Sequence, residues 1–376
     1  MKIVLTGGGS GGHFYPIVAV AQSLHTIITR ERLVDTEIYF ISDSPYDERL
    51  LFENGVEFKQ AAAGKMRRYF SILNFFDIFK TIIGVFKAVI QLYQIYPNVV
   101  FAKGGYASFP TLFAARILRI PVVIHESDSV PGRLNLWAGH FARRIALSYP
   151  EAAKYFPKDK VAYTGNPVRR EVAQPVTEGA HEFLNFEKSL PVILVLGGSL
   201  GAEILNDNIA DILPDLLEQY QIVHQTGVKN IENAKGRAEM ALVDSAHKER
   251  YKPFAFMNDL EMKMSAGAAT LVISRAGSTL FEIAAWGLPS LIIPITDSNG
   301  DHQRSNAYLY ARSGACKVLE EGNLTPHVLL NEIDRLMDAP EELKTMAESA
   351  KNFARLDAGD KIAETLVEIA MEHETT

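Results

Sequence analysis

The stretch Lys2-Ile-Val-Leu-Thr-Gly-Gly-Gly-Ser-Gly-Gly-His13 is a short apolar run that breaks into a glycine-rich loop. Glycines in such a loop permit a tight turn and let backbone N–H groups approach a diphosphate at the start of the next helix. Gly7, Gly9 and Gly12 have the spacing of the dinucleotide-binding fingerprint, a weak signal when it stands alone. A second loop of the same design, Pro191-Val-Ile-Leu-Val-Leu-Gly-Gly-Ser-Leu-Gly-Ala202, follows about half a chain later. The repeat predicts two similar domains.

The rest of the sequence alternates short apolar runs with helix-length segments, which is typical of buried parallel strands in an α/β protein. The runs lie at residues 3–6, 38–42, 99–102, 122–125, 192–196, 271–274 and 291–294. A chain of 376 residues is long enough for two cores. We expect the boundary near Gly165-Asn-Pro167, and the helical segment 341–372 could pack on either half.

The composition is that of a globular enzyme, with 47% hydrophobic and 22% charged residues. A formal net charge of -7 argues against a nucleic-acid partner, because phosphate binding needs clustered Lys and Arg. The single cysteine, Cys316, excludes an intrachain disulfide and fits a reducing compartment. The first residues contain no apolar span of secretory length, so we expect a cytoplasmic protein.

Two groups of residues in the first half carry acid–base chemistry. His13 follows the glycine loop and would project from the first helical turn, where it is either a general base or a group that caps the loop or binds phosphate. His125-Glu-Ser-Asp128 ends an apolar strand, which places two carboxylates where α/β active sites form. The alternative is a solvated turn in which one carboxylate caps the next helix.

In the second half, Ser274-Arg-Ala-Gly-Ser-Thr-Leu-Phe-Glu282 predicts a strand, a turn of small residues and a helix. Such a turn offers N–H groups to a phosphate, and Glu282 could accept the two hydroxyls of a ribose. An ordinary helix-start glutamate is the alternative. The sequence has no Asp-x-Asp pair and no His-Glu-x-x-His spacing, so we expect no catalytic metal.

An NAD-dependent dehydrogenase is the competing enzyme hypothesis. Asp43, at the end of the second apolar run, could serve as its acidic ribose ligand. The second glycine loop counts against this hypothesis, because one dinucleotide needs one such loop. Two loops suit a diphospho-donor and a diphospho-acceptor that meet in a cleft.

The segment from Lys65 to Ile90 contains more apolar and aromatic residues than one helix face can bury. Asp77, Lys80 and Lys87 interrupt it, so we expect no membrane-spanning helix, which needs about 20 nearly uncharged residues. The segment is either an interfacial patch of exposed Phe and Ile beside Lys and Arg, or a core helix with its lysines in water.

Ordered groups of residues along almost the whole chain resemble those of one family. They are Thr6-Gly-Gly-Gly-Ser-Gly-Gly-His13 with Pro16, Gly104-Gly-Tyr106, His125-Glu126 with Pro131-Gly132 and Asn135, Gly165-Asn-Pro-Val-Arg169, Gly197-Gly-Ser-Leu-Gly-Ala202 with Leu205-Asn206, and Glu282-Ile-Ala-Ala285 with Gly287-Leu-Pro289. The chain is similar in these groups to the MurG-type transferases of peptidoglycan synthesis, which move N-acetylglucosamine (GlcNAc) from UDP onto lipid-linked N-acetylmuramic acid (MurNAc).

The resemblance implies a GT-B fold, with two Rossmann-like, doubly wound α/β domains that face each other across a cleft. Residues 1–165 would bind the acceptor and residues 166–349 the donor, while the terminal helix, about residues 350–376, would cross back to the first domain. The implied chemistry inverts the sugar linkage and needs no cofactor or metal, with UDP-GlcNAc as donor substrate. The implied acceptor is undecaprenyl-pyrophosphoryl-MurNAc-peptide at an anionic inner-membrane surface, which would make the protein peripheral at the cytoplasmic face of the cell membrane.

The resemblance also implies roles for individual residues. Ser199 in the Gly197 loop would contact the donor diphosphate, with Arg169 near it, and Met257 would offer backbone groups to uracil. The turn Gly277, Ser278 and Thr279 with Glu282 would hold phosphate and ribose, and His302 and Gln303 would read the GlcNAc hydroxyls. Ser10, Gly11, Gly12 and Asp128 complete the expected donor-binding set.

Two residues differ from the common family pattern. Ser127-Asp128 stands where Gln-Asn is frequent, and Ser10 where Thr is frequent. A sugar contact made by an amide would here fall to the Asp128 carboxylate.

The expected reaction is attack by the MurNAc 4-hydroxyl on the anomeric carbon of UDP-GlcNAc, which gives a β1,4 bond and UDP. His13 is the first candidate for the base and Glu126 the second. The alternatives are a related GT-B enzyme with another lipid acceptor, such as a diacylglycerol glucosyltransferase, and a UDP-sugar-binding regulator without turnover.

Overall fold

The computed structural model describes residues 1–64, 73–198, 202–296 and 298–374. The chain forms two compact units, of which the first comprises Met1–Arg169 with Arg355–Thr376 and the second Arg170–Ala354. Each unit has its own parallel sheet and its own cores on both faces of that sheet. The α/β class and the two doubly wound domains expected from the sequence are therefore confirmed.

The first unit contains a seven-stranded sheet with the order β3-β2-β1-β4-β5-β6-β7 in its described residues. The strands are β1 Lys2–Thr6, β2 Glu37–Ser42, β3 Val56–Gln60, β4 Val99–Ala102, β5 Val122–Glu126, β6 Arg144–Leu147 and β7 Val161–Tyr163. The chain order reverses between β1 and β4, where Thr6 lies opposite Ala102. The carboxyl ends of strands at such a reversal form the ligand crevice of open α/β sheets.

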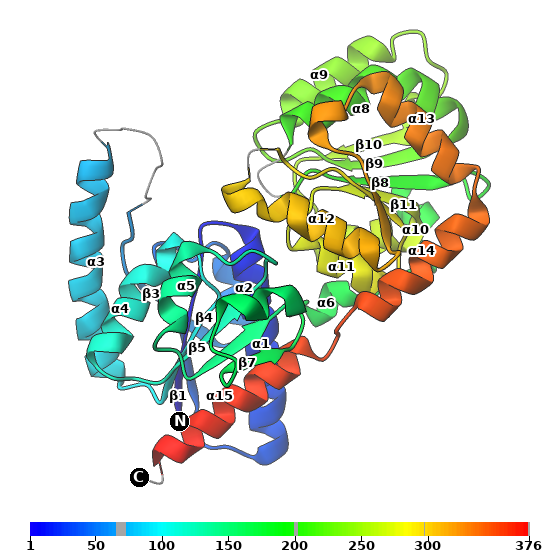
Figure 1. Cartoon of the computed structure of the whole chain (residues 1–376). Coiled ribbons are helices and arrows are strands. Elements are labelled where there is room, and N and C mark those ends of the chain that lie inside the picture. Colours follow the sequence, from blue (N-terminus) through cyan, green and yellow to red (C-terminus); the bar gives the residue numbers. More distant parts are fainter. Residues whose placement is uncertain (65–72, 199–201, 297, 375–376) are drawn as a thin grey trace. The chain divides into compact units, whose positions relative to one another are not determined.

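Helices cover both faces of this sheet. They are α1 Gly11–Glu31, α2 Glu48–Glu53, α3 Leu73–Ile95, α4 Phe109–Ile117, α5 Arg133–Gly139 and α15 Ala358–Glu374, with short 3₁₀ turns at Tyr106–Ser108 and Pro150–Tyr155. Figure 1 shows α15 beside α1, and the two helices bury Ala363, Leu366 and Ala370 with Ile17 and Leu24 in one core. The end of the chain thus completes the first unit.

The second unit repeats this plan with a six-stranded sheet of order β10-β9-β8-β11-β12-β13 among its described residues. The strands are β8 Val192–Leu196, β9 Gln221–Gln225, β10 Tyr251–Phe254, β11 Ala269–Ser274, β12 Ser290–Ile292 and β13 Cys316–Val318. The helices are α6 Arg170–Ala173, α7 Ala180–Leu184, α8 Glu203–Gln219, α9 Ile231–Ala241, α10 Asp259–Ala268, α11 Thr279–Trp286, α12 His302–Arg312, α13 Pro326–Met337 and α14 Pro340–Phe353, with 3₁₀ turns at Lys248–Arg250, Asn299–Asp301 and Glu321–Asn323. In this repeat β8 corresponds to β1 and β11 to β4.

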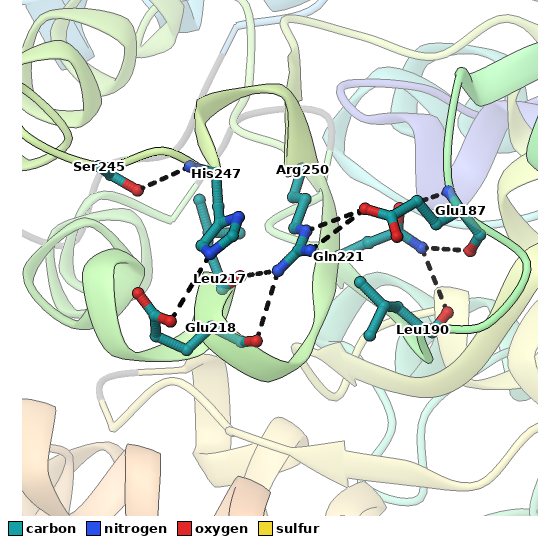
Figure 2. Close-up of polar contacts among 8 residues, drawn as sticks. All are labelled: Glu187, Leu190, Leu217, Glu218, Gln221, Ser245, His247 and Arg250. Carbon is teal, nitrogen blue, oxygen red and sulfur yellow. Dashed lines mark hydrogen bonds and ion pairs between the residues drawn. The ribbon is translucent and has the colours of Figure 1, made fainter.

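A polar network fastens the loop before β8 at the amino edge of the second sheet (Figure 2). The buried Gln221 amide donates to the carbonyl of Glu187 at 2.8 Å and to that of Leu190 at 3.2 Å, and it accepts from Glu187 N–H at 2.7 Å. Arg250 donates to the Glu187 carboxylate at 3.1 Å and to the Leu217 carbonyl at the end of α8 at 2.8 Å. An arginine at a helix end satisfies carbonyls that have no partner within the helix. This network stabilises the scaffold at the edge opposite the glycine loop.

The apolar segment predicted at residues 65–90 falls partly outside the described residues, which begin again with α3. By length and composition Asp77–Ile95 is apolar enough to cross a membrane, so the charges alone do not exclude a spanning helix, contrary to the expectation. Ala88, Leu92 and Ile95 are nevertheless buried in a core of the first unit, and α3 packs against α4. One face of α3 is therefore a core face, whereas Lys80 and Lys87 are exposed.

Candidate active site

The first glycine loop connects β1 to α1 at the carboxyl edge of the first sheet. Gly8 and Gly9 have φ angles of 150° and 90°, and a Cβ on Gly9 would lie 2.6 Å from the Tyr106 ring. Only glycine combines this backbone with so close a neighbour. Ser10 is the N-cap of α1, whose first turn contains no acidic residue, so its N–H groups and helix dipole favour an anion.

His13 lies in the first turn of α1, as the sequence predicted. Its Nδ1 is 2.9 Å from Ser10 Oγ, and its ring lies 3.4 Å from the position of a Cβ on Gly105. With a proton on Nδ1 donated to Ser10, Nε2 has the lone pair that a general base needs. Gly11 and Gly12 belong to the same turn.

Glu126 ends β5 and is 3% exposed. Its Oε1 accepts from Asp128 N–H at 2.9 Å, while its Oε2 accepts from Gly132 N–H at 3.1 Å and Asn135 Nδ2 at 2.9 Å. The solvated turn considered from the sequence is wrong, because Glu126 is buried, although its contact with Gly132 does reach the N-cap of α5. Burial raises the pKa of Glu126 to about 7, and the charge of Asp128 raises it further.

His125 is fully buried, and its Nε2 lies 2.9 Å from the Gly165 carbonyl and 3.2 Å from Ser148 Oγ. Burial lowers its pKa well below the usual range, so the ring stays neutral. Its contacts bind the end of β5 to the segment after β7. His125 is a structural residue of this edge.

Lys103 is a site residue that the sequence reasoning missed. It directly follows β4, is 1% exposed, and donates its backbone N–H to the Thr6 carbonyl at 2.9 Å. Burial lowers the pKa of Lys103 to about 8, whereas the charges of Glu126 and Asp128 raise it. A lysine directly after an all-apolar run was the signal in the sequence, since a buried cation requires a counter-charge.

Two further residues of the first unit lie beside the glycine loop. Asp43 accepts from Tyr106 Oη at 2.8 Å, so the carboxylate that a dehydrogenase would offer to a ribose is bound within the unit. Arg169 is largely buried, with its guanidinium 4.2 Å from the centroid of the Tyr15 ring on α1. The predicted residue Arg169 therefore lies in the first unit.

In the second unit, two glycine turns follow the adjacent strands β8 and β11, whose ends pair Leu196 with Ser274. Gly198 has a φ of 82°, and a Cβ on Gly198 or Gly277 would meet no atom within 4 Å. Both turns thus border open space at one edge of the sheet. Ser199 lies outside the described residues.

The turn after β11 leads into α11, with Ser278 at its N-cap, Thr279 as its first residue and Glu282 in its first turn. The Gly277 and Ser278 carbonyls accept from the N–H groups of Leu280 and Phe281 at 3.2 and 3.1 Å. The backbone N–H groups of the first helical turn point out of the helix start, where the positive end of the helix dipole suits a phosphate.

The remaining predicted residues also follow strand ends of the second sheet. Met257 is buried after β10, and its N–H donates to Gln225 Oε1 at 3.2 Å. His302 and Gln303 begin α12, and Gln303 Oε1 accepts from Ile295 N–H at 3.2 Å. The Met257 N–H and the side-chain oxygen of Gln303 thus already have hydrogen-bond partners within the unit. In the described ranges, no group of three His, Cys, Asp or Glu side chains has a metal-binding arrangement.

Comparison with known proteins agrees with this architecture. Residues 3–147 match the glycosyltransferase family 28 N-terminal domain, and residues 192–362 match the C-terminal domain of that family. The chain is 37% identical over 347 residues to "UDP-N-acetylglucosamine–N-acetylmuramyl-(pentapeptide) pyrophosphoryl-undecaprenol N-acetylglucosamine transferase 2" of Bacillus thuringiensis subsp. konkukian, covering 92% of this chain and 94% of the relative. A transferase of the same name from Treponema denticola, without the number, is 36% identical over 373 residues, covering 94% and 93%.

A solved structure carries the MurG name of the family that the sequence resembles. The crystal structure of Acinetobacter baumannii MurG matches with a TM-score of 0.71 and 26% identity, covering 98% of this chain and 99% of that one. The chain belongs to the MurG family of glycosyltransferases. The GT-B fold and the family expected from the sequence are thereby confirmed.

Membership in the MurG family replaces the dehydrogenase alternative and identifies the chain as a UDP-sugar glycosyltransferase. The structure brings Ser10, His13, Glu126 and Asp128 to one edge of the first sheet, and Gly277, Glu282 and Gln303 to the corresponding edge of the second. The role of each residue in this MurG-family protein remains a prediction.

Proposed function

We propose that this protein transfers GlcNAc from UDP-GlcNAc to the 4-hydroxyl of MurNAc in undecaprenyl-pyrophosphoryl-MurNAc-peptide. The observation that carries the proposal is the similarity over more than nine-tenths of the chain to transferases whose name states this donor and acceptor. The acceptor oxygen attacks the anomeric carbon, its proton passes to a base, and the bond to the diphosphate breaks to release UDP. The product has the inverted, β1,4 linkage.

The first unit would supply the acid–base chemistry. His13 suits the role of base, because Ser10 fixes one ring nitrogen and the positive end of α1 lies beside it. Glu126 suits a positioning role better, since three N–H groups already surround its carboxylate. Ser10, Gly11, Gly12, Asp128 and Arg169 would contribute contacts to the bound substrates.

The second unit would hold the donor. The starts of α8 and α11 offer N–H groups to the diphosphate, Glu282 accepts the ribose hydroxyls, and the segment at Met257 receives uracil. His302 and Gln303 would read the sugar hydroxyls. The donor needs no resident metal in this proposal, because helix starts and Arg169 offset the charge on the leaving diphosphate.

We also propose that α3 docks the protein on an anionic inner-membrane surface. Its outward face carries exposed apolar side chains, namely Ile78, Phe79, Ile82, Ile83, Phe86, Ile90 and Tyr93. Lys80 and Lys87 flank this face on a helix whose opposite side is buried in the core. Apolar residues beside lysines on a surface helix suit an interface between lipid headgroups and acyl chains. The protein would then be peripheral at the cytoplasmic face.

A transfer assay tests the function. Radiolabelled UDP-GlcNAc, UDP-glucose and UDP-galactose are each offered with lipid-linked MurNAc-peptide or with diacylglycerol. We expect product only from UDP-GlcNAc and the MurNAc lipid. Transfer to diacylglycerol would point to a different GT-B transferase, and UDP-GlcNAc binding without any product would point to a sugar-binding regulator.

A further inference from the structure

Lys103 carries a buried ammonium group at the carboxyl edge of the first sheet. Its backbone follows β4 and binds the end of β1, because its N–H donates to the Thr6 carbonyl. Its Cβ lies 3.2 Å from the position of a Cβ on Gly7. Its Nζ has no hydrogen-bond partner among the residues that the structure describes. An ammonium group loses a large solvation energy when it is buried, so it requires nearby negative charge.

The titratable groups around Lys103 come from three elements. Glu126 and His125 end β5, which pairs with β4 so that Ala102, next to Lys103, lies opposite Ile124. On the other side of Lys103, a Cβ on Gly104 would lie 3.0 Å from the Asn135 amide that binds Glu126. Asp128 follows Glu126, and His13 on α1 faces the loop after β4. His125 stays neutral because burial, assisted by the positive charge of Lys103, lowers its pKa. The charged members are therefore one ammonium and two carboxylates.

Glu126 is the centre of a hydrogen-bonded turn in this group. Its carboxylate accepts from the N–H groups of Asp128 and Gly132 and from the Asn135 amide. Ionised acceptors make the stronger hydrogen bonds, so protonation of Glu126 would weaken all three. The turn that carries Asp128 and leads into α5 would then lose its anchor.

We propose that Lys103 is a positioning residue of the transfer reaction, whose buried ammonium favours the carboxylate form of Glu126 beside Asp128 and thereby helps to hold the turn from Glu126 to Asn135 in its working geometry. This inference rests on the proposed transferase function. Asp128 acts in the opposite direction, because its negative charge favours a proton on Glu126. Lys103 and Asp128 thus act in opposite directions on the pKa of one carboxyl group.

The proposal predicts the effects of neutralising each partner. In Lys103→Met, the pKa of Glu126 rises above its value of about 7, because the lysine charge that lowers it is gone. The acidic limb of the kcat profile then moves to higher pH, and a move of 1 unit from about 7 would lower activity at pH 7 about fivefold. Asp128→Asn moves the pKa of Glu126 down, and the double variant returns it toward the starting value.

The experiment measures kcat and KM of the full-length protein between about pH 5.5 and pH 9, with UDP-GlcNAc and a short-chain, soluble MurNAc acceptor. The variants are Lys103→Met, Asp128→Asn, the double variant, and Lys158→Met as an exposed-lysine control. We expect an unchanged KM for UDP-GlcNAc in Lys103→Met and partial recovery of kcat at neutral pH in the double variant. An equal loss at every pH, without recovery in the double variant, would overturn the proposal.

A second readout follows the carboxyl group itself, because a pH–rate profile does not show which group titrates. Protein labelled with ¹³C at the glutamate carboxyl carbons is titrated by NMR, and Glu126→Gln assigns the signal. A pKa of Glu126 that is the same with and without the Lys103 charge would overturn the proposal. This titration needs no turnover, so an inactive wild-type protein would contradict the proposed function while Lys103 is still tested. If Lys103→Met does not fold, Asp128→Asn must still lower the Glu126 pKa.

Discussion

The two units place a basic residue at the same position of their sheets. The partners of its charged group differ between the two units. Lys103 follows β4, the neighbour of glycine-loop strand β1, and Arg275 follows β11, the neighbour of glycine-loop strand β8. Both are buried, at 1% and 8% exposed. Arg275 donates to Glu321 at 2.6 Å and to the Ile293 carbonyl at 3.1 Å, whereas Lys103 Nζ has no partner among the described residues.

The difference separates a structural cation from a functional one. Arg275 and Glu321 form a direct ion pair, and Glu321 also accepts from Thr296 N–H at 3.0 Å. Of the guanidinium nitrogens of Arg275, Nε alone lacks a partner among the described residues. Such a pair fixes the ends of β11 and β12. Lys103 instead leaves its hydrogen-bonding capacity unused beside two carboxylates. The comparison predicts that chemistry depends on the first unit, and that donor binding and stability depend on the second.

The largest effect on rate should come from His13→Ala in the first unit. Loss of a general base lowers turnover by roughly 10²- to 10⁴-fold, while donor affinity changes little. Single-turnover transfer and calorimetric binding of UDP-GlcNAc measure the two quantities. A large loss of binding would instead make His13 a phosphate ligand. A loss of turnover in Glu126→Gln that is greater than the loss in His13→Ala would assign the base to Glu126.

Arg275→Met should show the structural side of the comparison. It leaves the partly buried Glu321 carboxylate without its arginine partner, which lowers the free energy of unfolding by about 1–3 kcal/mol. Urea denaturation of the full-length protein measures the loss, and Arg275→Met with Glu321→Leu should recover most of it. If Arg275→Met left the free energy of unfolding unchanged but shifted the pH profile of kcat, Arg275 would not be a structural cation, and the contrast with Lys103 would be wrong.

Glu282→Ala sharpens the comparison on the donor side. A ribose contact is common to UDP-GlcNAc and UDP, so both should weaken together, by roughly ten- to a hundredfold for a loss of about 1.5–3 kcal/mol. Calorimetry with each nucleotide gives the affinities. If the affinity for UDP is unchanged, Glu282 is only a helix-start carboxylate that the positive end of the α11 dipole stabilises.

The smallest effect concerns the outer face of α3. Phe79 is 51% exposed, which meets the expectation for that residue, whereas the side chains of Phe75 and Phe76 are not described. Phe79→Ser with Phe86→Ser should weaken binding to anionic vesicles roughly tenfold, because rings inserted only partly into the interface contribute a fraction of the about 1.5–3 kcal/mol that each contributes when fully buried. Activity on membrane-embedded acceptor should fall with it.

Two controls accompany this change. Met240→Ser with Val243→Ser removes exposed apolar side chains from the second unit and should leave vesicle binding intact. Activity on a soluble, short-chain acceptor should survive the α3 changes. Equal losses on both acceptors would mean a folding defect and would contradict docking through α3.

The sequence sufficed for the parts of the fold that depend on local pattern. Apolar runs predicted β1, β2, β4, β5, β8, β11 and β12, because strands buried on both faces are continuously apolar. It did not identify β9, Gln221–Gln225, in which His224 and Gln225 are buried. His224 is held by Tyr251 and Asn206 at 3.0 Å each, and those partners come from distant elements.

The same reason explains what was missed in the candidate site. His13 and Glu126 follow recognisable local motifs, so they could be singled out from the sequence. The importance of Lys103 depends on two carboxylates of the neighbouring strand and its loop, and on a glycine loop that packs against its Cβ. Only the pairing of β4 with β5 brings these groups together.

The return of the chain to the first unit has a consequence for synthesis on the ribosome. The first unit is interrupted after Arg169, and its helix α15 is synthesised only after the whole second unit. Until then α1 lacks the apolar partner that Leu366 and Ala370 provide. Because domains fold as units during synthesis, the later-made second unit can finish folding before the first. A nascent chain halted before α15 should therefore expose α1 to proteases and chaperones while the second unit already resists them.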